Sequence, residues 1–132
     1  MESPDVPTAL LRLAEALVVL AAPAAAQIEW SAAHGCSDEL ALDFDWANSW
    51  TLALIDRADP RLINQRLHDL LAAIDDQLNR MSGHHNADRW TDDALKTDPG
   101  WRDIRALANE AIQEIESLNI IAIPPGPKRS QD

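Results

Sequence analysis

The chain has 132 residues, the size of a single domain whose core is large enough to fold without a metal ion or a disulfide. Its 22 acidic and 11 basic side chains give a formal net charge of −11, which argues against direct binding to nucleic acid or anionic membranes and favours a basic protein partner. Cys36 is the only cysteine in the sequence, so no disulfide can form within the chain, as expected for a cytoplasmic protein.

The first predicted helix begins after Asp5, a capping residue followed closely by a proline, and ends or bends at Pro23. An alanine-rich extension is expected to continue it toward Trp30. The stretch resembles the apolar part of a secretory signal, but its flank is acidic and Glu15 interrupts it, so we expect neither a cleaved signal nor a membrane span. The wide apolar surface makes a homodimer an alternative way of burying it. The leucines at helical spacing are Leu10, Leu13, Leu17 and Leu20.

The second segment, residues 37–54, allows two interpretations. Ser37 can cap a helix whose first turn carries two acidic residues, as the helix dipole favours. Residues 39–47 also alternate between apolar and polar side chains, which is the period of a half-buried strand. We favour the helix and keep the strand as the alternative.

Two further helices have clearer starts. Asp59–Pro60 and Asp98–Pro99 each place a carboxylate before a proline in the first helical turn, and apolar stripes follow each pair, over residues 63–81 and 101–118. Gly83 is suited to end the earlier helix, and Thr91 can cap a short helical turn between the two. The predicted fold class is thus all-α, an up-and-down bundle of about four main helices with a short extra helical turn in the 82–97 loop.

The end of the chain changes character after Asn119. Three isoleucines are expected to pack as an extended strap, and a Pro-rich polar tail follows them. We therefore predict one helical-bundle domain over residues 1–123 and a flexible tail over residues 124–132.

Histidines gather in the loops. An up-and-down bundle brings residues 31–37 and 82–97 to the same end, where His34, Cys36, His84 and His85 could complete a tetrahedral zinc shell. Their spacing matches no recurrent zinc framework, however, and adjacent histidines usually diverge. We expect a solvated loop with no cofactor, and keep a metal-binding helical protein as an alternative.

Two arginine–histidine pairs carry a family resemblance. Arg80 and His85 fit an Arg-x4-His pattern, and Arg61 and His68 fit Arg-x6-His. Both resemble the signature of HEPN domains, small helical bundles that include metal-independent ribonucleases. The resemblance implies that the arginine stabilises phosphate charge and the histidine handles the proton of the attacking hydroxyl. The sequence departs from the family at the position after each arginine, where Met81 and Leu62 replace the usual polar residue.

The aromatic residues favour binding over catalysis. The chain has five tryptophans and no tyrosine, and Trp46 and Trp50 lie one helical turn apart beside Asp43 and Asp45, with Trp90 in the long loop. Tryptophan is enriched in interface hot spots. We predict a non-catalytic module of the inhibitor, antitoxin or immunity type, which binds a basic protein through these five residues. The alternative is that the indoles cover the ends of the bundle or a homodimer seam.

Overall fold

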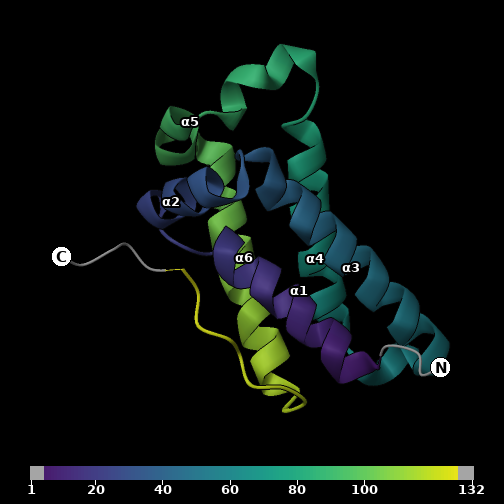
Figure 1. Ribbon diagram of the computed structural model, residues 1–132. Coiled ribbons are helices and arrows are strands. Elements are labelled where there is room, and N and C mark those ends of the chain that lie inside the picture. Colours follow the sequence, from purple (N-terminus) through teal and green to yellow (C-terminus); the bar gives the residue numbers. More distant parts are fainter. Residues whose placement is uncertain (1–4, 128–132) are drawn as a thin grey trace.

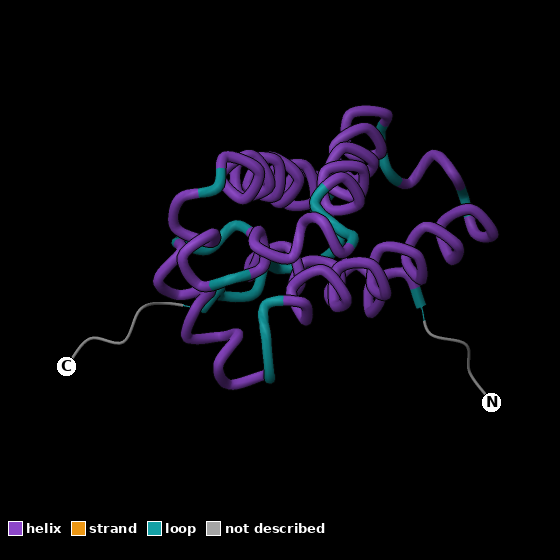
Figure 2. Tube along the Cα trace, turned by 90° about the horizontal axis from the view of Figure 1, so that it is seen from above, coloured by secondary structure: helices purple, strands orange, loops and turns teal. Residues whose placement is uncertain are grey.

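Every regular element of residues 5–127, the part of the chain that the computed structural model describes, is helical (Figures 1 and 2). This confirms the all-α class and the choice of helix over strand for residues 39–47. The α-helices are α1 (Val6–Leu20), α2 (Ala24–His34), α3 (Asp38–Ala58), α4 (Gln65–Arg80), α5 (Asp92–Thr97) and α6 (Pro99–Ser117), and the 3-10 segments are η1 (Pro60–Leu62) and η2 (His84–Trp90).

The core forms around α1, which packs between α3 and α6, while α4 packs along α6 (Figure 1). The predicted leucines of α1 are fully buried because their spacing of three and four residues places them on one side of the helix. Phe44 of α3 and Trp101 of α6 are also fully buried. The packing is bundle-like, and α3 contacts its sequence neighbour α4 much less than it contacts α1.

The alanine-rich extension of the first helix is a separate helix. The chain turns through 118° between α1 and α2, and Pro23 occupies the position before the first residue of α2. Gln27 holds the bend: its fully buried amide donates to the carbonyls of Val19 and Leu20, at 3.1 and 2.9 Å. These carbonyls lie in the last turn of α1, where the helix itself provides no backbone N–H donors for them. No single described helix is long and apolar enough to cross a membrane, and α1 and α2 would be so only as a bent pair.

Arg105 of α6 forms hydrogen bonds beside Gln27. Its Nη1 donates to Oε1 of Gln27 and to the carbonyl of Leu95, each at 2.9 Å. Burial lowers the pKa of Arg105, since removal from water penalises the charged form. The two acceptors offset this penalty, so α1, α2, α5 and α6 are joined by one buried polar network.

The two Asp-Pro starts have different outcomes. Asp98 caps α6 as predicted, accepting the backbone N–H of Gly100 at 2.8 Å. The helix expected at Pro60 begins instead at Gln65, because Asp59 accepts the N–H of Arg61 and closes only a 3-10 turn. The chain then extends through Ile63, which is buried, and Asn64 caps α4.

The C-terminal segment lies against the bundle. Asn119, at φ 56°, redirects the chain after α6, and the three isoleucines of residues 120–123 are partly buried against the core, as the predicted strap requires. Gly126 lies so close to α1 that an added Cβ would be 3.2 Å from the carbonyl oxygen of Val18. The predicted flexible tail begins at residue 124, and its residues 128–132 lie outside the described part of the chain.

Candidate partner-binding surface

Residues 80–93 form an ordered cap over one end of the bundle. Arg89 grips Asp98 through two hydrogen bonds, from Nε at 2.8 Å and Nη2 at 3.1 Å. The Arg89 hydrogen bonds lower the pKa of the Asp98 carboxyl; burial opposes this effect, and the Gly100 N–H adds to it. The backbone carbonyl of Arg89 accepts the indole N–H of Trp101 at 2.7 Å. Arg89 thus holds the start of α6 through both its side chain and its backbone.

Trp90 is part of this cap. Its indole N–H donates to the carbonyl of Met81 at 2.6 Å, and its ring meets Trp101 edge-on at 5.2 Å. Ser37, predicted to cap α3, makes no capping bond and donates its hydroxyl to the Trp90 carbonyl instead. The loops at 31–37 and 82–97 therefore meet, as expected. Trp90, however, uses its N–H inside the fold and is only half exposed.

The residues of the alternative zinc site do not converge. His34 directs Nδ1 to the carbonyl of Trp30 at 2.8 Å and stacks on that indole, with ring centroids 4.0 Å apart. Cys36 is exposed, while His84 and His85 belong to η2. Within residues 5–127, no three His, Cys, Asp or Glu side chains are grouped to hold a metal ion. The structure therefore gives no support to the zinc alternative.

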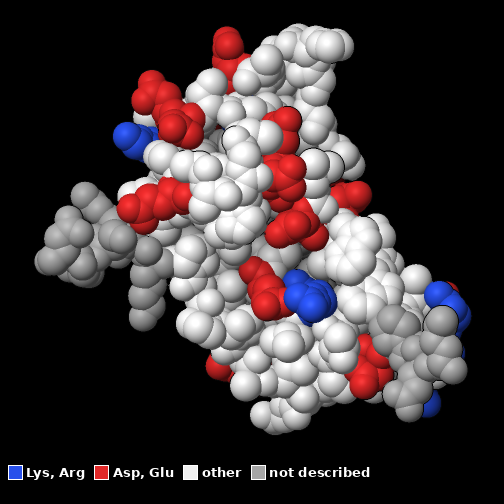
Figure 3. All heavy atoms as spheres, viewed as in Figure 1, with Lys and Arg blue, Asp and Glu red and all other residues white. Residues whose placement is uncertain are grey.

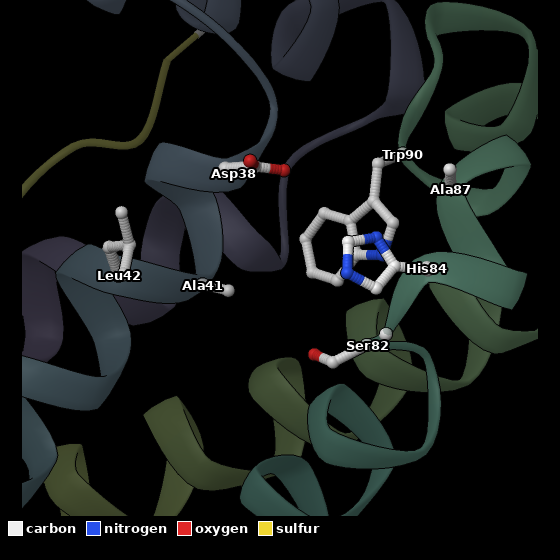
Figure 4. A pocket seen from close by; sticks show the side chains of 8 residues that line it. Asp38, Ala41, Leu42, Ser82, His84, Ala87 and Trp90 are labelled. Atoms are coloured by element: carbon white, nitrogen blue, oxygen red, sulfur yellow. The ribbon is translucent and has the colours of Figure 1, made fainter.

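A hollow of about 600 Å³ separates the start of α3 from η2, with Asp38 facing His84 and Trp90 across it (Figure 4). Ser82 also lines it, so the hollow holds the three residue types of a serine hydrolase. The Ser82 hydroxyl, however, donates to the Leu78 carbonyl at 2.9 Å, and no hydrogen bond joins these three side chains in the described part of the chain. The arrangement lacks the nucleophile–base hydrogen bond that activates a serine.

Each arginine of the HEPN-like pairs forms an ion pair with a nearby aspartate. Arg80 forms an ion pair with Asp76 one turn earlier on α4 and lines a shallow hollow against α6, whose lining does not include His85. Arg61 pairs with Asp59 at 3.2 Å, while His68 lines a different depression beside α3. Neither of these two hollows is lined by both the arginine and the histidine of a pair.

The outer side of α3 carries the most exposed large apolar side chains of residues 5–127. Trp46 is 62% exposed and Leu42, one turn earlier, is 58% exposed. The Trp50 ring lies 5.0 Å from that of Trp46 and is half-buried. Asp43 and Asp45 are exposed beside them and form no ion pair within residues 5–127. We call these five residues the α3 surface.

A groove of about 460 Å³ borders the α3 surface, between α1, α2 and α3. Trp46 and Asp43 line it from α3 and Trp30 lines it from α2. From α1 come Arg12 and Glu15, an exposed pair with Nη1 and Oε1 3.4 Å apart. The small side chains Ala16 and Ala47, together with Val19 and His34, complete the lining. Acidic side chains greatly outnumber basic ones on this face of the molecule (Figure 3).

Four of the five predicted binding residues thus lie together on α3, and Trp90 lies at the end of the bundle, where it lines the same hollow as Leu42 (Figure 4). Sequence reasoning missed Leu42, although its spacing of four from Trp46 could have revealed it, and it missed Trp30, which only the bend after α1 brings near α3. No protein-family model, curated protein or solved structure matches this chain. The α3 surface is therefore the feature of the molecule that points to a function.

Proposed function

We propose that this chain is a non-catalytic interaction module of the inhibitor, antitoxin or immunity type, which binds a basic protein through the α3 surface. The observation that carries the proposal is the exposure of Trp46 and Leu42 on adjacent turns of one helix. Removing a mostly exposed indole from water contributes about 2–3 kcal/mol to association. Such side chains are typical anchors of an interface.

The charges around Trp46 select the kind of partner. Asp43 and Asp45 have no ion-pairing partner among the described residues, so their charge remains available to an incoming cation. Complementary charge accelerates encounter and suppresses wrong partners, while the buried indole slows dissociation. A basic protein surface satisfies both requirements.

A second copy of this chain fits the surface less well. A twofold contact between identical patches brings each patch against itself. Both copies would then bring the carboxylates of Asp43 and Asp45 into the contact, and the repulsion between these like charges costs free energy. Charge thus favours a different, basic protein over a homodimer.

The proposal is tested by affinity capture from an extract of the cells that produce the protein. The wild-type chain and the double variant Leu42→Ala/Trp46→Ala are immobilised in parallel, and bound proteins are identified by mass spectrometry at low and high salt. We expect a basic protein that binds the wild-type chain stoichiometrically, dissociates as salt rises, and is lost from the double variant.

The matched control is Asp103→Asn/Glu116→Gln, which removes two exposed carboxylates from α6 and leaves the α3 surface intact. Thermal unfolding of each variant checks that its fold persists. Equal capture by the wild-type chain and a folded Leu42→Ala/Trp46→Ala variant contradicts the proposal. So does a partner that the α6 control loses as fully as the α3 variant does.

A further inference from the structure

The groove between α1, α2 and α3 combines aromatic walls with carboxylates. Two tryptophans from different helices line it, Trp30 and Trp46, together with the carboxylates of Glu15 and Asp43. Indole rings attract cations through the negative charge of their faces, and carboxylates pair with them directly. The volume of about 460 Å³ lies within the usual range for small-ligand sites.

We propose that this groove receives one arginine side chain of the basic partner, with its guanidinium against the Trp46 ring and paired with Asp43. The inference rests on the proposed function and names the group that the partner inserts. Asp43 precedes Trp46 by three residues on α3, a spacing that places carboxylate and ring on the same side of the helix. Trp46 has the most exposed ring available to a guest, and Asp43 has no competing ion pair within residues 5–127.

The combination of an indole ring and a nearby carboxylate favours arginine over lysine. A guanidinium is flat, so its face can stack on an indole while its edge donates to a carboxylate. A lysine ammonium is a compact, strongly hydrated charge that cannot do both in this way.

Arg12, a guanidinium of the chain itself, already lines the groove. It contacts Glu15 at a long 3.4 Å, and its side chain is 59% exposed. This exposed pair is weak, because water screens the attraction between such charges. Arg12 can therefore yield space to a guest, and Asp43 in the same groove is exposed.

The test uses two blocked pentapeptides of equal charge: one with five lysines, the other with its central lysine replaced by arginine. Binding is followed by the NMR signals of the indole N–H groups in ¹⁵N-labelled full-length protein, and the Trp46 signal is assigned by its loss in Trp46→Leu. We expect the arginine peptide to bind about two- to fivefold more tightly and to shift the Trp46 signal.

Two variants test whether the preference for arginine depends on this groove. Trp46→Leu keeps an apolar side chain but removes the ring, and Asp43→Asn removes the charge; each should abolish the preference for arginine. Asp103→Asn on α6 is the control and should keep the preference. Equal affinity for the two peptides, with the Trp46 signal shifted by both, overturns the arginine site but leaves a basic-partner surface standing.

Three other outcomes also overturn the inference. One is an arginine preference that survives in Trp46→Leu. Another is the absence of any Trp46 shift at millimolar peptide, in which case affinity capture with the Leu42→Ala/Trp46→Ala variant decides the proposed function separately. The third is a concentration-dependent dimer in sedimentation that Trp46→Leu dissociates, because a second copy then occupies the surface.

Discussion

The ion pair between Arg89 and Asp98 predicts how mutation of Asp98 changes the stability of the protein. Asp98 serves two purposes, since it caps α6 through the Gly100 N–H and pairs with Arg89 through both carboxylate oxygens. Replacing Asp98 with alanine removes both. Loss of a helix cap costs about 1 kcal/mol, and loss of a partly exposed two-bond ion pair costs about another 1 kcal/mol. We therefore expect Asp98→Ala to lower the free energy of unfolding by about 2 kcal/mol.

Asp98→Asn separates the two contributions. Its amide oxygen can still accept the Gly100 N–H, but the charge that Arg89 grips is gone, so we expect a loss of about 1 kcal/mol at neutral pH. Urea unfolding of the wild-type chain, Asp98→Ala and Asp98→Asn, monitored by circular dichroism, measures the differences. Asp103→Asn serves as the control, because that carboxylate is exposed and forms no ion pair within the described residues.

The same pair has a defined pH dependence. Arg89 holds the pKa of Asp98 below its ordinary value of 3.8, so the folded state favours the ionised carboxylate. This contribution is fully present above pH 3.8 and is lost as the pH falls through the lower pKa of the folded protein. The stability gap between the wild-type chain and Asp98→Asn should therefore narrow below pH 3.8. A gap that stays constant, or an asparagine variant as unstable as the alanine variant at pH 7, refutes the assignment of roles.

Other side chains give sharp expectations of their own. Gln27→Leu should lower the free energy of unfolding by about 3 kcal/mol in urea titrations, because it deprives the Leu20 carbonyl of its amide donor and Arg105 of an acceptor; wild-type stability would contradict the role given to the amide. Trp46→Leu should change the melting temperature in calorimetry by no more than about 2 °C, since the ring is mostly in water, and a larger fall would mean that the ring supports the fold. Trp101→Phe should cost about 2–3 kcal/mol in chemical unfolding, as it leaves the Arg89 carbonyl without its donor and opens space in the core; a neutral effect would show that the indole N–H contributes nothing.

The sequence predicted helices better than it predicted where they start. Asp59–Pro60 and Asp98–Pro99 are alike as local patterns, yet only Asp98 caps an α-helix. The difference is tertiary: Ile63 is buried in extended backbone, and the side chain of Asn64 provides a second cap five residues after Asp59. Local capping patterns do not indicate which of two nearby caps the core will favour.

The candidate site was predictable only in the part that lies on one helix. Trp46 and Trp50, together with Asp43 and Asp45, follow from helical spacing along a single segment. The groove required Trp30 and Arg12 to approach them, and these come from helices whose relative direction is set by the bend at Pro23. Helical periodicity carries no information about that angle.

Gln27 therefore influences the groove although it is buried away from it. Its amide is buried beneath the bend, out of reach of any partner, yet it fixes the direction of α2, and α2 supplies the Trp30 wall of the groove. The geometry of the groove is thus set from the interior of the protein. A substitution at Gln27 or Arg105 can consequently change the shape of the groove while every surface residue stays the same, and a designer who alters the bundle core for stability will alter the groove as well.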